Sequence, residues 1–153
     1  KTRPMGRNAS GVRGIRLKDN KDEVVGMISV NDMDANILVV SENGYGKRSS
    51  LEDYRLTNRG GKGVKTISIT TKTGQLVSLK SVTDSDDLMI INKSGIAIRM
   101  QVADLRVMGR ATQGVKVISI KDGDGIAAVA KVMNDEEDIE DINDIEFTGD
   151  TIK

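Results

Sequence analysis

The sequence predicts an all-β fold of the propeller kind, with about three four-stranded blades. Three observations lead to this prediction. A thirteen-residue motif occurs three times, and its copies begin at residues 3, 55 and 106. Short apolar runs alternate with turns rich in Gly, Asn and Asp, as they do in proteins built from short strands. Residues 1–133 nowhere show the 3.6-residue periodicity of an amphipathic helix.

The motif is the first element of each repeat. Its copies are RPMGRNASGVRGI (3–15), RLTNRGGKGVKTI (55–67) and RVMGRATQGVKVI (106–118), called motifs 1, 2 and 3 below. Glycine beside cations predicts a loop whose backbone can approach a ligand closely. When the copies are aligned on Gly11, Gly63 and Gly114, the basic residues that coincide are Arg3, Arg55 and Arg106, then Arg7, Arg59 and Arg110, and then Arg13, Lys65 and Lys116.

The remaining elements of each repeat are predicted strands. A polar turn follows each motif, and then comes a run of the β type, at 24–30, 76–82 and 126–132. In the first two repeats, aliphatic runs at 37–40 and 88–91 come next, and they are short enough to be central strands buried on both faces. A glycine turn then leads to further strands at 45–50 and 96–101, and the repeat closes at EDYR or ADLR. Each repeat therefore predicts about four strands.

The charge is unevenly distributed along the chain. Residues 1–133 contain 22 Lys and Arg against 14 Asp and Glu, a net charge of +8, whereas residues 134–153 contain 1 against 9, a net charge of −8. The third repeat does not complete, because NDEEDIEDINDIEF stands where the aliphatic run should recur. We predict a basic β domain over 1–133 and a disordered acidic tail over 134–153. The alternatives for the tail are a short helix docked on the domain and a segment that competes for the basic surface.

Missing residue types narrow the possible chemistry. The chain has no Cys and no His, so disulfides and histidine-based catalysis are excluded. The acidic turns at 32–34 and 122–124 lack the calcium-loop pattern, and RGGKG lacks the spacing of a phosphate-binding loop. We therefore predict no catalytic residue, no metal site and no cofactor in this chain. No apolar run is long enough for a membrane helix, and we expect an intracellular protein without a membrane partner.

The three motifs predict contacts to the backbone of duplex DNA. Arginine forks match phosphate oxygens, and no recognition helix for base reading is present. Only three aromatic residues occur, too few to predict a stacking surface for single strands. The alternative is that the charges form a solvated face and the glycines form tight turns. The predicted DNA-binding residues are Arg3, Arg7, Arg13, Arg16, Lys47, Arg48, Arg55, Arg59, Lys62, Lys65, Arg99, Arg106, Arg110 and Lys116.

Three stretches, PMGRNASGVRGIRL, NGYGKRSSLEDYRLTNRGGKGVKTI and IRMQVADLRVMGRATQGVKVI, resemble the C-terminal domain of bacterial DNA gyrase A. The likeness covers nearly all of 1–133. In that family the domain is a β-pinwheel, a propeller-like ring of about six four-stranded blades. It bends duplex DNA around a basic rim and supports ATP-dependent negative supercoiling. The resemblance implies that this chain holds the last three blades and the acidic tail, and that it belongs to a longer protein.

The same resemblance implies partners and a setting. The partners would be duplex DNA, the rest of gyrase A, and the gyrase B component of the heterotetramer, in the bacterial cytoplasm at the nucleoid. This domain would be a non-catalytic part of a type II DNA topoisomerase, an isomerase whose ATP and Mg²⁺ act in other parts of the enzyme. We also expect the fragment to self-associate, because unpaired strand edges at its ends would be exposed.

This chain departs from the family at one motif, the gyrase box. The box reads Gln-Arg-Arg-Gly-Gly-Lys-Gly and lies in the first blade. Residues 57–63 match only its last five positions, so we interpret them as a box-like blade loop and expect the true box upstream. The alternatives are the equivalent domain of topoisomerase IV and a propeller that binds proteins instead of DNA. The box-like loop consists of Thr57, Asn58, Arg59, Gly60, Gly61, Lys62 and Gly63.

Overall fold

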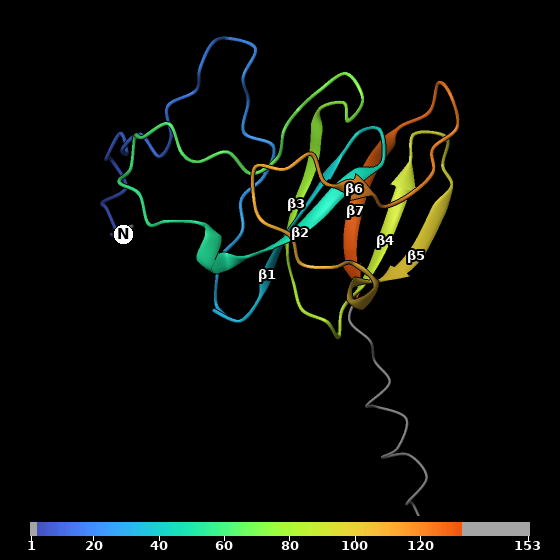
Figure 1. The fold of residues 1–153 in the computed structure, drawn as a ribbon. Helices are drawn as coiled ribbons and strands as arrows, with labels where there is room; N and C mark the ends of the chain where they lie inside the picture. The colour runs from blue at the N-terminus through green and yellow to red at the C-terminus, as the bar shows by residue number, and fades with distance from the viewer. Residues whose placement is uncertain (1–2, 133–153) are drawn as a thin grey trace, which may run out of the picture.

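The computed structural model describes residues 3–132, and its regular elements are almost all strands, which confirms the all-β prediction (Figure 1). Two short 3₁₀ helices, η1 and η2, lie where the two complete hairpins end and the motifs begin. In chain order the elements are β1 (Asn36–Ser41), β2 (Tyr45–Ser50), η1 (Leu51–Asp53), β3 (Leu76–Val82), β4 (Asp87–Asn92), β5 (Ala97–Gln101), η2 (Val102–Asp104), β6 (Val115–Lys116) and β7 (Ile126–Val132).

The strands form two antiparallel sheets. Sheet 1 has the order β3-β1-β2-β6, and sheet 2 has the order β5-β4-β7. The aliphatic strands β1 and β4 are central in their sheets, as their sequences predict. Both central strands carry apolar side chains on both faces, and this composition suits a strand that is covered on each side.

Strands of successive repeats are interleaved within sheet 1. The hairpin β1–β2 precedes motif 2, β3 follows motif 2, and β6 is part of motif 3. Sheet 2 repeats the first three of these strands with β4, β5 and β7. The three repeats therefore make two sheets in the described part of the chain, and the expectation of three blades is corrected to two. The reason is that the run after each motif joins the sheet of the preceding repeat, β3 pairing with β1 and β7 with β4, while β6 of motif 3 pairs with β2.

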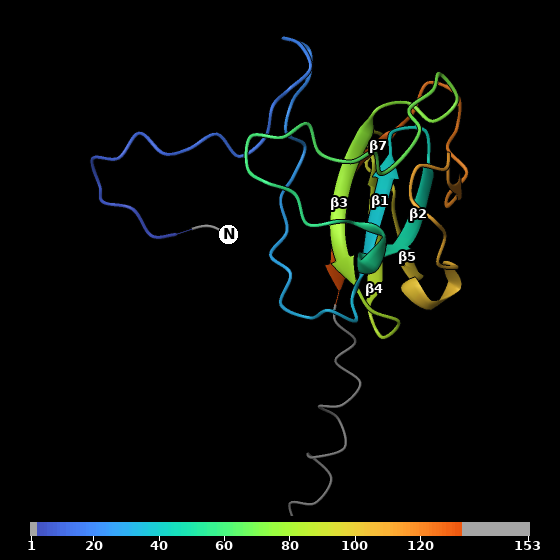
Figure 2. The same cartoon turned by 60° about the vertical axis from the view of Figure 1, so that its left-hand side comes forward.

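The strand predicted at 24–30 is not formed. Residues 3–35 contain no strand beyond an isolated bridge between Ile15 and Gly61, and the N-terminal part of this segment extends away from the sheets (Figure 2). The equivalent strands β3 and β7 each pair with the first strand of the preceding hairpin. Within residues 3–132 no strand pairs with the run at 24–30. Without a strand partner the apolar run stays irregular: Ile28 packs against the cluster that contains Val39, whereas Met27 is 91% exposed.

The core lies between the two sheets. Leu38 and Val40 of sheet 1 pack with Leu88 and Ile90 of sheet 2, together with Val102 of η2, and all these side chains are buried. A second, smaller cluster covers the other face of β1, where Ile67 of motif 2 is buried. Because the two faces of β1 carry alternate side chains, one strand contributes to both clusters. Motifs 2 and 3 therefore add apolar residues beside the sheets as well as cations at the surface.

Candidate nucleic-acid interface

The three motifs share one backbone conformation at their aligned glycine. The φ angles of Gly11, Gly63 and Gly114 are 80°, 79° and 82°. These values lie in the left-handed region, which residues with a side chain rarely adopt, so the sequence positions require glycine. The repeat seen in the sequence is therefore also a repeat of local geometry.

Motifs 1 and 2 are joined by two backbone hydrogen bonds. The amide of Gly60 donates to the carbonyl of Gly14 at 2.8 Å, and the amide of Arg16 donates to the carbonyl of Gly61 at 2.9 Å. The bonds hold the two chain segments next to each other although Gly60 comes 46 positions after Gly14.

The same two bonds recur between motifs 2 and 3. The amide of Ala111 donates to the carbonyl of Thr66 at 3.1 Å, and the amide of Ser68 donates to the carbonyl of Thr112 at 3.0 Å. Under the alignment of the motifs, these four residues are the counterparts of the four that join motifs 1 and 2. Consecutive motifs therefore lie side by side in sequence order, joined by one repeated pattern.

Motif 3 is also docked on sheet 1. Val115 and Lys116 pair with Gly46 and Tyr45 of β2, and the amide of Val117 donates to the carbonyl of Gly44 at 2.8 Å. The approach is close, because a Cβ atom on Gly114 would lie 2.6 Å from the carbonyl oxygen of Gly46. Motif 3 is thus held both by its neighbour, motif 2, and by the edge of a sheet.

Most predicted DNA-binding residues are exposed along the joined motifs. The spacing of the motifs places cations of different repeats on adjacent segments. Between motifs 1 and 2 a hollow is lined by Arg13 and Arg59 together with Val12, Asn58 and Gly60. We call the exposed cations of the motifs and of the position just after motif 1 the basic row; they are Arg3, Arg7, Arg13, Arg16, Arg55, Arg59, Lys62, Lys65, Arg106 and Lys116.

Lys47 and Arg48 do not belong to this surface, and their prediction as DNA contacts is corrected. Their side chains lie inside the fold, with 1% and 7% of the residue surface exposed. The Arg48 guanidinium bonds the Asp84 carboxylate at 2.5 Å and the Val102 carbonyl at 3.2 Å. The sequence contains an indication that Lys47 is buried, because the aligned position of the next hairpin is the apolar Ile98. An inward-facing position can hold a cation only if its polar atoms find partners.

Two further predicted contacts are occupied within the protein. Arg110 is half-buried, and its guanidinium donates to the carbonyls of Asp53 at 2.7 Å and Lys65 at 3.1 Å. Arg99 lies on β5, away from the motifs, and forms an ion pair with Asp87 at 2.6 Å. Neither side chain is presented as part of the row, so we leave both out of the interface.

The box-like loop at 57–63 forms the centre of the row. Gly60 and Gly63 both have positive φ, 74° and 79°, which turn the backbone so that it can pair with motif 1. Arg59 and Lys62 stay exposed on this loop. Motif 2 therefore places two cations between the neighbouring motifs, where the hollow lined by Arg13 and Arg59 opens.

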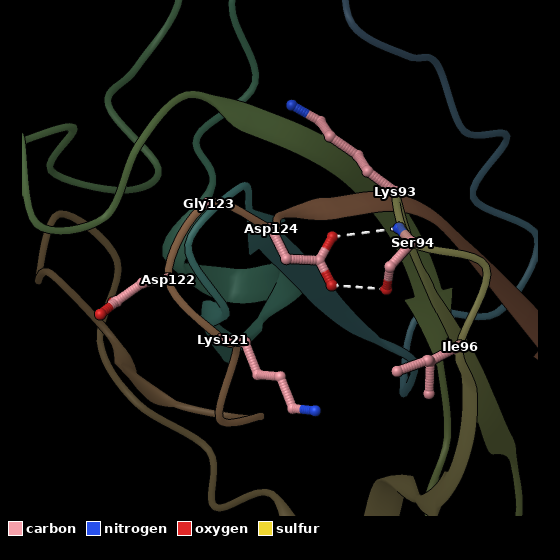
Figure 3. A pocket seen from close by; sticks show the side chains of 7 residues that line it. All are labelled: Lys93, Ser94, Ile96, Lys121, Asp122, Gly123 and Asp124. Atoms are coloured by element: carbon pink, nitrogen blue, oxygen red, sulfur yellow. Dashed lines mark hydrogen bonds between the residues drawn. The ribbon is translucent and has the colours of Figure 1, made fainter.

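A second hollow lies between the tip of the β4–β5 hairpin and the turn at 121–125. Its carboxylate, Asp124, accepts hydrogen bonds from the Ser94 hydroxyl at 2.7 Å and the Ser94 amide at 3.1 Å (Figure 3). The bond from the Ser94 hydroxyl, followed by that from the Gly125 amide, lowers the pKa of Asp124. Within residues 3–132 no group of three or more candidate ligand side chains could hold a metal ion. Asp124 thus ties the turn at 121–125 to the tip of the β4–β5 hairpin.

Comparison with known proteins places these repeats in a family. The family model of the DNA gyrase C-terminal domain, beta-propeller, matches residues 3–31, 35–83 and 86–133. The DNA gyrase A protein of Staphylococcus aureus strain NCTC 8325 is 51% identical over 138 residues, which are 89% of this chain and 15% of that protein. The protein of strain MRSA252 is 50% identical over 135 residues. The chain spans 15% of the length of these relatives.

Solved structures show the same architecture. The structure of the DNA gyrase A C-terminal domain matches with a TM-score of 0.75 and 30% identity, over 86% of this chain and 44% of that chain. The C-terminal domain of DNA topoisomerase IV matches with a TM-score of 0.73 and 22% identity, over 80% of this chain and 38% of that chain. The second likeness concerns the fold alone. No helix within residues 3–132 is long and apolar enough to cross a membrane.

Proposed function

This chain belongs to the family of DNA gyrase C-terminal domains, and we propose that it binds and bends duplex DNA through the DNA backbone. The basic row is the protein surface that makes these contacts. It supports the wrapping of DNA that accompanies negative supercoiling by gyrase. The domain itself is non-catalytic, and its partners are duplex DNA, the rest of gyrase A, and gyrase B, in the bacterial cytoplasm at the nucleoid.

One observation carries this proposal, namely the repeated pair of hydrogen bonds that joins consecutive motifs. A ligand that meets the row encounters cations from motif 1, then motif 2, then motif 3. Duplex DNA presents phosphates at regular intervals along its length, so it is a ligand that can contact several motifs at once. Guanidinium groups can bind phosphate oxygens in pairs, and this geometry suits the arginines of the row.

The basic row can recognise the charge and shape of the DNA backbone, and the described residues offer no element that recognises bases. Within residues 3–132 there is no α-helix that could enter the major groove. We therefore expect weak sequence preference and a stronger dependence on how easily the DNA bends. An intact gyrase box upstream in the full-length sequence would separate this assignment from the equivalent domain of topoisomerase IV.

The salt dependence of binding to linear duplex DNA tests the proposal. We expect the logarithm of the affinity to fall linearly with the logarithm of the salt concentration, with a slope of about −3 to −6 if the row neutralises several phosphates. Single-stranded DNA of equal length is the control and should bind more weakly, because the described residues offer few aromatic faces for stacking. An affinity that is flat between low and moderate salt would refute the proposed function.

A further inference from the structure

The ammonium group of Lys47 lies between β2 and motif 3. Its Nζ donates to the carbonyl of Gly109 at 2.9 Å and to Oγ1 of Thr112 at 3.3 Å. Both acceptors belong to motif 3, 62 and 65 residues further along the chain. Next to it on β2, the carbonyl of Arg48 accepts from the amide of Met108 at 2.7 Å. Lys47 and Arg48 of β2 therefore hold motif 3 at three residues, Met108, Gly109 and Thr112.

Burial makes the position of this ammonium group unusual. Lys47 is 1% exposed, and it is the largest of the fully buried side chains among residues 3–132. Removal from water lowers the pKa of Lys47, the nearby Asp53 carboxylate opposes this, and the Arg110 guanidinium adds to it. A buried ammonium group is costly unless acceptors are provided for it. Motif 3 supplies such acceptors, and the side chain and the motif therefore stabilise each other's position.

The second hairpin of the chain offers an internal comparison. At the position of Lys47 it carries Ile98 on β5. Within residues 3–132 no motif pairs along β5, whereas motif 3 pairs along β2. Lysine is thus found where a motif docks and isoleucine where none docks. Packing alone would be served by an apolar residue at either place, so the lysine is explained by the docked motif.

We propose that Lys47 is a positioning residue that fixes the place of motif 3 in the basic row, and this rests on the proposed function. Lys47 itself does not touch DNA. By holding Gly109 and Thr112, it sets where the flanking exposed cations Arg106 and Lys116 lie relative to motif 2. The half-buried Arg110 also ties motif 3 to η1 and motif 2, through the carbonyls of Asp53 and Lys65. These internal cations organise the motif, and the exposed ones contact phosphate.

A double-mutant cycle on the affinity for duplex DNA tests this inference. The variants are Lys47→Met, Lys116→Ala and the pair, in the full 153-residue chain. We expect Lys116→Ala to weaken binding less in the Lys47→Met background than in the wild-type background, with a coupling of at least about twofold in affinity, as for residues that share a network. A role in overall stability alone would leave the two changes additive.

Lys65→Ala is the matched control. Lys65 aligns with Lys116 and is exposed, but it lies in motif 2, which Lys47 does not hold. Its effect on affinity should be the same in both backgrounds. Thr112→Val is a milder variant that keeps the lysine and removes one of its acceptors, and it should show the same selective coupling to Lys116. It keeps the test informative if Lys47→Met does not fold.

Hydrogen exchange separates this inference from the proposed function. Lys47→Met should reduce the protection of the Val117 amide, which bonds Gly44 only while motif 3 is docked. Loss of that protection in a protein whose wild type shows no salt-dependent DNA binding would refute the proposed function and leave the docking role intact. Additive cycles together with unchanged exchange at Val117 would overturn the positioning role of Lys47.

Discussion

Arg59 and Arg110 occupy the same position of two motifs but have different surroundings. Arg59 is exposed beside the hollow between motifs 1 and 2. Arg110 is half-buried and donates to two backbone carbonyls. A shared residue type at an aligned position therefore does not establish a shared role, because the partners of a side chain depend on the packing around it.

This difference predicts different outcomes for the two alanine variants. Arg59→Ala should reduce the magnitude of the salt slope by about 0.9, the value for one phosphate contact. Its melting temperature should stay close to that of the wild type, because exposed positions contribute little to stability. Arg110→Ala should lower the free energy of unfolding by about 1–3 kcal/mol, because two hydrogen bonds to a charged group are lost. A destabilised Arg59→Ala protein would show that Arg59 is structural.

The hydrogen bonds of Asp124 predict that this carboxylate contributes to the loss of folding stability in acid. Hydrogen bonds, with that of the Ser94 hydroxyl foremost, lower the pKa of Asp124 in the folded state below its unfolded value. The stabilising contribution is therefore complete above the unfolded pKa, about 3.9, and is lost as the pH falls through the folded pKa. Asp124→Asn should lower the melting temperature at neutral pH and flatten its decline in acid. Asp122→Asn is the control, because Asp122 points away from Ser94 (Figure 3) and should leave the profile unchanged.

At the scale of elements, motif 3 is both a candidate binding loop and a strand of sheet 1. The two uses place different demands on the aligned glycines. Gly11 and Gly114 have nearly the same φ, 80° and 82°. A Cβ atom on Gly11 would meet nothing within 4 Å, whereas one on Gly114 would lie 2.6 Å from the Gly46 carbonyl oxygen. The pair therefore separates the cost of the backbone conformation from the cost of docking.

Gly114→Ala should destabilise the protein more than Gly11→Ala. Both variants suffer from placing a side chain at positive φ, which costs about 1–2 kcal/mol per residue. Only Gly114→Ala also forces β6 away from β2, so its loss in free energy of unfolding should exceed that of Gly11→Ala by a measurable margin in urea denaturation. Equal losses would mean that the docking of β6 contributes nothing to stability.

At the scale of the whole molecule, β5 and motif 1 are complementary. In sheet 1 the corresponding strand β2 pairs with a docked motif, and a Cβ on Gly46 would lie 3.0 Å from Cγ2 of Val117. Sheet 2 has Ala97 at the position of Gly46, so a motif docked there needs a smaller residue than Val117. Motif 1 has Gly14 at that place, whereas motif 2 has Thr66.

We therefore expect two copies of this chain to associate through motif 1 of one copy and β5 of the other. The register of β6 on β2 predicts that Val12 lies opposite Ala97 and Arg13 opposite Ile96. Contact of this kind would cover Ile15 and Ile96, which are 46% and 47% exposed. Light scattering over a range of concentrations should show a dimer or a larger species, because head-to-tail contacts either close into a ring or continue.

Gly14→Val tests this association at its tightest point. The added side chain should shift the protein towards the monomer, because it would meet Ala97. Gly6→Val, in the same motif but with nothing within 4 Å of its Cβ position, is the control and should associate like the wild type. A strict monomer at high concentration would show that the edge of β5 is protected in another way.

The sequence by itself determined the repeat, the all-β class, the strands at 76–82 and 126–132, and the positions of the motif cations. These follow from local patterns, since alternation, turn residues and spacing are properties of neighbouring residues. The acidic segment at 134–153 lies outside the described residues, so its predicted disorder stays a prediction. The role of the basic row in DNA binding likewise stays a proposal.

Only the tertiary structure decided which repeats share a sheet and which cations face solvent. The run at 24–30 has the composition of β3 and yet forms no strand, because a strand needs a partner that the local sequence does not reveal. Lys47, Arg48 and Arg110 are basic like the contact residues, and yet their side chains bond partners within the protein. Lys47 bonds motif 3, Arg48 bonds Asp84 and Val102, and Arg110 bonds Asp53 and Lys65. Hydrogen-bond partners 36 to 65 residues away settle their roles, and local sequence carries no information about contacts at that range.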